Sequence, residues 1–215
     1  MQIVLRVTGY HLREYYPRAF IGFLKKYYSG EKDLIGVEIG VYKGINTLNI
    51  FKYLPIKRLY LIDPYENSSD YIKSGDCKSD QGVLDNAKIE AQKRLSKFKK
   101  KIVWINEFSD TAYKKIPEKL DFVYIDGNHN YENVKRDMEN YYSLLKKESI
   151  LAGHDIDSFR HTGVLFAFAD FIKEKRLPYR IMNADWIIVN ISTDTYSQRV
   201  RERPILNEFM CSSAY

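Results

Sequence analysis

The sequence has few cysteines and no long apolar stretch. Cys77 and Cys211 are the two cysteines among 215 residues, and neither has a partner at zinc-ligand spacing. This pattern argues against a disulfide-built scaffold or a zinc finger and suits a reducing compartment. Apolar runs such as residues 35–41 and 185–191 end well short of the roughly 20 residues that a membrane helix needs, and the N-terminus lacks the pattern of a signal peptide. We therefore expect a cytoplasmic protein with no membrane partner.

The positive charge is not concentrated in one region. The formal net charge is +6 and the pI is about 9.0, which would suit an anionic partner. However, the lysines are spread along the chain, and the one dense run is at residues 97–101. Such a run at the end of a helix usually complements the helix dipole. Nucleic acid is therefore not the expected partner.

Short apolar segments alternate with amphipathic segments along the chain. Strands are expected at residues 34–39, 58–62, 101–105, 120–125, 149–153, 179–182 and 186–190, with the last two forming a hairpin. Helices are expected at residues 11–28, 47–54, 83–98, 133–145 and 164–175. This alternation predicts an α/β protein with a mostly parallel sheet covered on both faces. We divide the chain into an N-terminal helical extension (1–33), an α/β domain (34–192) and a polar tail (193–215).

In such sheets, ligands bind beyond the carboxyl ends of the strands. The first strand ends in Glu38, followed by a turn with Gly40 and Gly44. This turn lacks the G-x-G-x-x-G pattern of pyrophosphate-binding proteins. Glu38 would repel a phosphate but suits a cationic amino group or a sulfonium. A turn with glycines is common between a strand and a helix, so the motif alone is weak evidence.

Asp63 ends the second strand, roughly 20 residues beyond the glycine turn. A carboxylate there can accept hydrogen bonds from both hydroxyls of a ribose. The alternative is a turn-forming or capping aspartate before Pro64. The combination with the first motif favours a nucleoside ligand.

Together with these two motifs, residues 120–131 (LDFVYIDGNHNY) and 150–155 (ILAGHD) carry a family resemblance. The chain resembles class I S-adenosylmethionine (SAM)-dependent methyltransferases over about residues 34–190. It is similar to the branch of macrocin O-methyltransferase-like small methyltransferases, which has a D-G-x-H-x-Y signature. The resemblance implies a Rossmann-like, doubly wound, seven-stranded sheet with an antiparallel last strand. It also implies an enzyme with SAM as cofactor.

The resemblance further implies a cofactor site formed by one turn and several strand ends. Its residues would be Glu38, Gly40, Tyr42, Gly44, Asp63, Ser109 and Asp126. Glu38 would contact the methionine amino end, the two glycines would allow close approach, and Asp63 would bind the ribose hydroxyls. Ser109 would border the adenine, and Asp126 would lie under the sulfonium at the entrance to the substrate site.

His129, three residues after Asp126, is the candidate general base. An imidazole with an ordinary pKa near 6.5 suits proton abstraction at neutral pH. The alternative is a histidine that caps the following helix or faces solvent. His154 is left open between a structural role and a substrate contact, and His161 is assigned no role.

Some relatives bind a divalent metal through acidic residues at the ends of the fourth and fifth strands. Asp126 and Asp155 match these positions, while His154 replaces a residue that is acidic in several metal-dependent relatives. A carboxylate pair suits Mg²⁺, so Mg²⁺ bound by Asp126 and Asp155 is left open as a second cofactor.

The resemblance points to a hydroxyl on a sugar or small molecule as methyl acceptor, and a homodimer is left open. Two other classes remain at this stage: an NAD(P)-dependent oxidoreductase on a similar sheet, and a non-catalytic nucleotide- or RNA-binding protein. Binding of S-adenosylhomocysteine (SAH) against binding of NADH would separate the transferase from the reductase.

Overall fold

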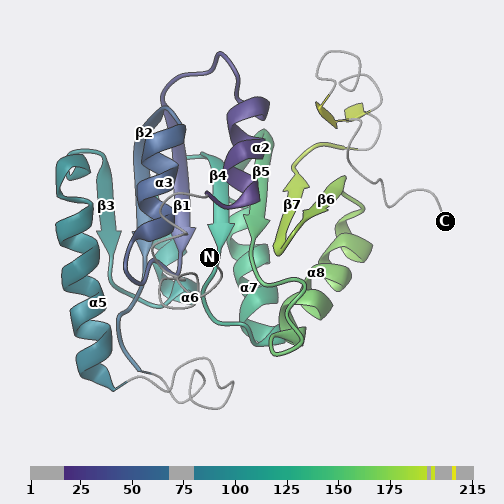
Figure 1. The fold of residues 1–215 in the computed structure, drawn as a ribbon. Coiled ribbons are helices and arrows are strands. Elements are labelled where there is room, and N and C mark those ends of the chain that lie inside the picture. The colour runs from purple at the N-terminus through teal and green to yellow at the C-terminus, as the bar shows by residue number, and fades with distance from the viewer. Residues whose placement is uncertain (1–16, 68–79, 193–194, 197–204, 207–215) are drawn as a thin grey trace, which may run out of the picture.

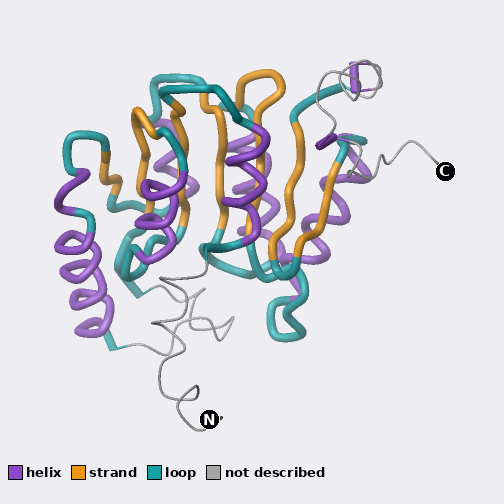
Figure 2. Tube along the Cα trace, turned by 45° about the horizontal axis from the view of Figure 1, so that its top comes forward, coloured by secondary structure: helices purple, strands orange, loops and turns teal. Residues whose placement is uncertain are grey.

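The computed structural model describes residues 17–67, 80–192, 195–196 and 205–206. In this part of the chain, one sheet lies between two layers of helices (Figures 1 and 2). Its strands are β1 (Leu34–Ile39), β2 (Ile56–Ile62), β3 (Ile102–Ile105), β4 (Leu120–Ile125), β5 (Leu145–Gly153), β6 (Tyr179–Met182) and β7 (Asp185–Val189). Its α-helices are α2 (Ala19–Tyr27), α3 (Ile45–Tyr53), α5 (Gln81–Arg94), α6 (Ser109–Ala112), α7 (Tyr131–Tyr142) and α8 (Thr162–Lys175).

The sheet has seven strands in the order β3-β2-β1-β4-β5-β7-β6. Strands β1 to β5 pair in parallel, while β7 runs antiparallel to both of its neighbours, β5 and β6. The predicted Rossmann-like fold class, with its antiparallel last strand, is confirmed. The strand order reverses between β1 and β4, and the crevice at such a reversal is where ligands bind in open α/β sheets.

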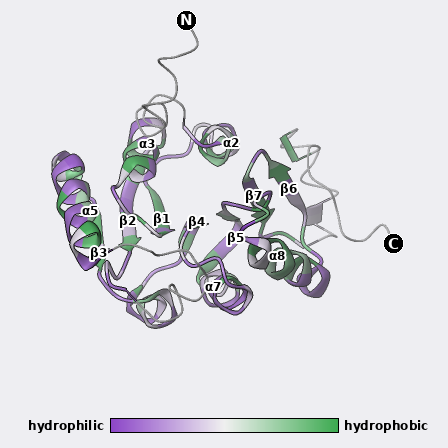
Figure 3. Ribbon diagram, turned by 60° about the horizontal axis from the view of Figure 1, so that its bottom comes forward, coloured by the Kyte–Doolittle hydropathy of each residue, from purple (hydrophilic) through white to green (hydrophobic). Residues whose placement is uncertain are grey.

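Each face of the sheet carries its own apolar core. Along β4, Phe122 and Tyr124 pack into the core under α2, α3 and α5, whereas Val123 and Ile125 pack into the core under α7 and α8. Successive side chains of a strand point to opposite faces, so a strand covered on both sides must be apolar throughout. Figure 3 shows the two helix layers on opposite sides of the sheet.

The expected elements are present, and most differences lie at their ends. The bounds of β1, β4 and β6 agree with the prediction. The helix expected at residues 11–28 begins only at Ala19 in the described residues, because Pro17 and Arg18 are not helical. Arg18 is extended, with ψ of 152°. Residues 11–16 and most of the expected tail lie outside the described residues.

Two further differences have local causes. Strand β5 begins at Leu145, four residues before the expected start, because Leu145 pairs with Leu120 of β4 ahead of a register shift, after which Ile150 pairs with Phe122. Helix α6 was not expected, since its four residues are too short to show a helical period. Within the described residues, no helix is long and apolar enough to cross a membrane.

Candidate active site at the carboxyl ends of the strands

The turn after β1 is built on left-handed backbone. Gly40, Tyr42 and Gly44 all have positive φ, at 83°, 47° and 71°. A side chain at position 40 would place its Cβ 2.0 Å from the backbone oxygen of Asp126, and one at position 44 would meet Ala91 of α5 at 3.3 Å. The packing of the chain itself therefore requires these glycines, a reason that the sequence motif did not reveal.

Asp63 closes this turn from the end of β2. Its Oδ2 accepts hydrogen bonds from the backbone N–H groups of Val41 (2.9 Å) and Tyr42 (2.8 Å), and its Oδ1 accepts one from Tyr65 (2.9 Å). Burial raises the pKa of Asp63, while these three hydrogen bonds favour the charged form. An ionised carboxylate has about four acceptor positions. Asp63 thus holds the turn and retains capacity to accept from a ligand hydroxyl.

Glu38 lies beneath the turn, almost fully buried at 1% exposure. Its two carboxylate oxygens accept hydrogen bonds from Asn46 and Thr47 in the first turn of α3. Burial raises the pKa of Glu38 to about 7, although these bonds favour the charged form. Glu38 pairs with Leu61 in the β1–β2 register, so it lies close to the strand end that carries Asp63.

Ser109 begins α6, beyond the end of β3. Its backbone oxygen accepts a hydrogen bond from Tyr141 at 2.8 Å, and its side chain bonds to the buried Asp137 of α7. Burial raises the pKa of Asp137 to about 7. Helix α7 therefore fixes the position of Ser109.

Asp126 forms an ion pair with Arg18, the residue just before α2. Arg18 Nη1 lies 2.7 Å from Asp126 Oδ2 and 2.8 Å from the hydroxyl of Tyr124. Burial lowers the pKa of Arg18, but its contacts with Asp126 and Tyr124 outweigh burial and hold this pKa well above its ordinary value. The Tyr124 hydroxyl in turn donates to Asp185 of β7, whose other oxygen accepts from the backbone N–H of Phe20.

Asp155 lies between two histidines. His129 Nε2 is 2.9 Å from its Oδ2, and His154 Nδ1 is 3.1 Å from its Oδ1. Burial would raise the pKa of Asp155, but hydrogen bonds from His129 and His154 hold it well below its usual range. His154 Nδ1 also lies 3.8 Å from Asp126 Oδ1. Asp126, His154, Asp155 and His129 thus form a continuous row at the ends of β4 and β5.

The structure gathers the expected residues into two groups. Glu38, Gly40, Tyr42, Gly44 and Asp63 surround the turn after β1, while Asp126, His129 and Asp155 follow β4 and β5. Ser109 lies at the start of α6. Their roles toward ligands stay predictions.

Sequence reasoning missed Arg18, Tyr124 and Asp185, and it gave His161 no role. The His161 ring lies against His129 with 4.0 Å between ring centroids. One sequence signal was available: Pro17 interrupts the helix expected at residues 11–28, and Arg18 is the N-cap of the helix that follows. Nothing local pairs Arg18 with Asp126, because they are 108 residues apart in the chain.

This Rossmann-like sheet is of the open α/β class, in which ligands bind beyond the carboxyl ends of the strands. Residues 37–156, more than half of the chain, match the Methyltransferase domain family (Methyltransf_24). The chain belongs to this family. Comparison with curated proteins gave no significant match.

Solved structures share the fold. The calicheamicin methyltransferase CalS11 has a TM-score of 0.62 at 15% identity, over 87% of this chain and 82% of that one. An O-methyltransferase from Bacillus cereus in complex with SAH has a TM-score of 0.57 at 14% identity, over 82% of both chains. An rRNA methylase from Streptococcus thermophilus has a TM-score of 0.55 at 12% identity, over 80% of this chain and 95% of that one. At such low identity, the likeness supports the fold alone.

Proposed function

We propose that this protein is a SAM-dependent methyltransferase that methylates a hydroxyl group on a sugar or another small molecule. The observation that carries the proposal is the position of Asp63 against the turn after β1, at the reversal of strand order, in a chain of the methyltransferase family. Asp63 would accept from the ribose hydroxyls. Glu38 would attract the cationic amino group of the cofactor, and Ser109 would border the adenine.

The acceptor would bind beside Asp126 and His129. Methyl transfer breaks the bond from sulfur to the methyl carbon and forms a bond from the acceptor oxygen to that carbon, and the hydroxyl proton must leave. In this proposal the His129 imidazole takes that proton, and its Nε2 lies 2.9 Å from Asp155 Oδ2. The Asp155 carboxylate would orient the ring and stabilise its positive charge, as in other acid–histidine pairs.

The donor set at Asp126 and Asp155 does not fit Mg²⁺. This cation prefers oxygen ligands in octahedral geometry. Here one oxygen of Asp126 is paired with Arg18 at 2.7 Å, and both oxygens of Asp155 face imidazole nitrogens. The reaction is therefore derived without Mg²⁺.

Isothermal titration calorimetry with SAH tests the cofactor site. We expect the full chain to bind SAH and not NADH. Asp63→Ala should weaken SAH binding by about 100-fold, equivalent to about 3 kcal/mol. Asp170→Asn, which changes an exposed carboxylate on α8, is the matched control and should bind like the parent. NADH binding without SAH binding would support a reductase instead.

A screen with methyl-labelled SAM against nucleotide sugars and phenols tests the chemistry. On an acceptor found in this way, His129→Ala should lower kcat by roughly 10²–10⁴-fold with SAH affinity unchanged. Tyr131→Phe, two residues further on, should keep near-parental kcat because its hydroxyl bonds to Asp170 on α8. A parental kcat in His129→Ala would remove the base assignment.

The likeness to macrocin O-methyltransferase-like enzymes and the cytoplasmic location remain predictions. The sequence also predicts a polar loop at residues 65–82, of which residues 68–79 lie outside the described residues. The region around Arg18 borders the acceptor side in this proposal. Acceptor specificity should be sought there.

A further inference from the structure

Three of the four histidines in the sequence meet at one carboxylate. His129 follows β4, His154 follows β5, and His161 immediately precedes α8. His129 and His154 each lie within 3.1 Å of an Asp155 oxygen, and the His161 ring lies against that of His129 with an angle of 33° between the planes. Histidine is a common metal ligand, so this convergence raises the question of a metal.

Two trios could hold an ion, and both include Asp155. In each trio, the three candidate ligand atoms lie within 4.8 Å of one another. The first consists of Asp126, His154 and Asp155, and the second of His129, Asp155 and His161. In the first, the Arg18 guanidinium pairs with Asp126 at 2.7 Å and would repel a metal cation. In the second trio, the contacts of Asp155 are to the imidazoles of His129 and His154, which can lose a proton and become neutral, whereas a guanidinium stays charged. The second trio is therefore the better candidate.

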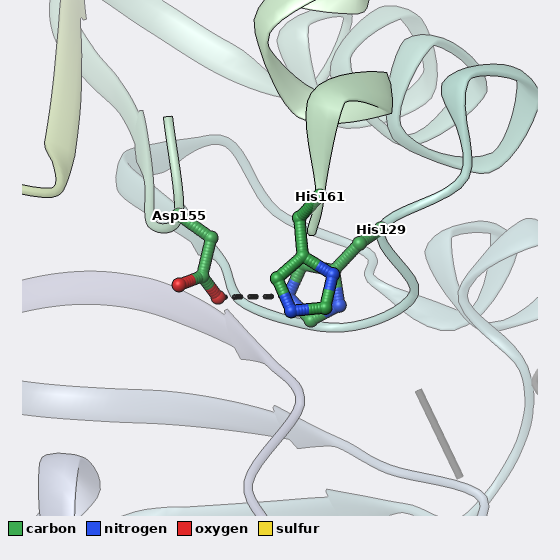
Figure 4. A group of neighbouring side chains, drawn as sticks. All are labelled: His129, Asp155 and His161. Atoms are coloured by element: carbon green, nitrogen blue, oxygen red, sulfur yellow. Dashed lines mark ion pairs between the residues drawn. The ribbon is translucent and has the colours of Figure 1, made fainter. Parts of the chain in front are cut away.

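The second trio is held by packing. Figure 4 shows the His129 and His161 rings over one another, with the Asp155 carboxylate at their edge. A Cβ on Gly163 would lie 2.4 Å from the backbone oxygen of His129, so the start of α8 rests directly on the loop that carries this histidine. Asp155 itself has a left-handed backbone, with φ of 61°. Such contacts fix the three side chains relative to one another before any ion binds.

We propose that His129, Asp155 and His161 bind a divalent first-row transition-metal ion, with Zn²⁺ as the representative ion. Two imidazoles and one carboxylate suit Zn²⁺, Co²⁺, Ni²⁺ or Fe²⁺ much better than Mg²⁺. Asp155 supplies a negative charge at neutral pH. Three protein ligands leave a fourth position for water or for another ligand.

The site has a consequence for activity, which rests on the proposed function. A metal ion on His129 Nε2 would replace the contact with Asp155 that orients the proposed base. Metal binding and base function therefore compete for His129, and Zn²⁺ should lower the rate of methyl transfer. The binding site itself does not depend on this consequence.

The test uses the full chain, stripped with EDTA and titrated with Co²⁺ and Zn²⁺. We expect one ion per chain, with visible d–d absorption for Co²⁺ and a calorimetric isotherm for Zn²⁺. Loss of an outer-shell partner alone costs roughly 10–100-fold in metal affinity, so His161→Ala should weaken Zn²⁺ binding by about 100-fold or more. His154→Gln keeps all three proposed ligands but changes an outer-shell contact of Asp155, so it should weaken Zn²⁺ binding by no more than about tenfold, clearly less than His161→Ala.

The opposite pattern, with binding lost in His154→Gln and kept in His161→Ala, would overturn the proposal in favour of the Asp126 trio. Loss in both variants would also overturn the three-residue site, as would a parent that binds neither ion. SAH titration of His161→Ala separates these results from misfolding and from the proposed function. If His161→Ala binds SAH as tightly as the parent does, the variant is folded. If the parent binds Zn²⁺ but not SAH, the proposed methyltransferase function is contradicted and the metal site is not.

Discussion

The two halves of the candidate site are held together by different forces. On the side that we propose for the cofactor, Asp63 accepts from three backbone N–H groups and Glu38 accepts from neutral side chains. On the side that we propose for the acceptor, Asp126 and Asp155 are paired with Arg18 and two histidines. Backbone partners are largely independent of side-chain identity, whereas charged partners change with each substitution. The comparison teaches that the contacts of Asp63 should survive side-chain changes that leave the backbone in place and fail where the backbone must move, while substitutions on the acceptor side should remove contacts directly.

The largest effect is expected where the two halves touch. Gly40→Ala would force a Cβ to within 2.0 Å of the Asp126 backbone oxygen and would strain a residue with φ of 83°. We expect a loss of about 3–5 kcal/mol in the free energy of unfolding and loss of SAH binding. Urea unfolding and calorimetry measure both.

Gly22→Ala is the matched control, because a Cβ there meets nothing within 4 Å. It lies inside helix α2 and should stabilise the protein by about 0.5–1 kcal/mol. Equal stability losses in both variants would contradict the contact between the two halves.

The cofactor half should show a pH signature. Folding raises the pKa of Glu38 from an ordinary 4.5 to about 7 through burial, so the folded protein holds this proton more tightly. The resulting stabilisation is full below about pH 4.5 and is lost as the pH rises through about 7. Relative to Glu38→Gln, the parent should therefore lose up to about 3 kcal/mol between pH 5 and pH 8.

Urea unfolding at several pH values in this range measures the difference. Asp137→Asn is a comparison variant outside the turn. Burial raises the pKa of Asp137 to about 7, so its effect on stability should depend on pH in the same direction as that of Glu38. If the parent and Glu38→Gln differ in free energy of unfolding by the same amount at every pH, folding does not change the pKa of Glu38.

A smaller effect is expected from Arg18. Arg18→Ala would leave Asp126 and the Tyr124 hydroxyl without this donor, at a cost of about 1–2 kcal/mol in the free energy of unfolding. The free energy of unfolding of Arg18→Lys should lie between those of Arg18→Ala and the parent. A lysine ammonium keeps the positive charge but lacks the planar fork of donors of the guanidinium. Arg58→Ala removes an exposed ion pair with Glu118 and should change little. An Arg18→Ala variant as stable as Arg58→Ala would contradict the charged network.

The sequence predicted what local patterns determine. The bounds of β1 and β4 followed from apolar runs buried on both faces, and the β6–β7 hairpin followed from the turn at Asn183 and Ala184. The cofactor motifs came from residues at strand ends, which parallel strands bring to one edge of a sheet. These features depend on neighbours in the chain.

The acceptor side could not be predicted in the same way. The pairing of Arg18 with Asp126 depends on how α2 lies on the sheet, and no local period records it. The contact of His161 with His129 depends on Gly163, whose small size lets α8 rest on the preceding loop. His161 therefore looked like an ordinary loop residue, and the row of histidines and carboxylates emerged only in three dimensions.

Because Arg18 pairs with Asp126, residues 34–192 do not contain the whole candidate site. Through Tyr124 and Asp185, Arg18 joins the entry of the first described helix to the last strand of the sheet. Grafting residues 34–192 onto a relative's amino-terminal segment would transplant the carboxylates without the guanidinium that neutralises one of them. Exchange of parts between such enzymes should therefore preserve recognition of the nucleoside and alter the choice of acceptor.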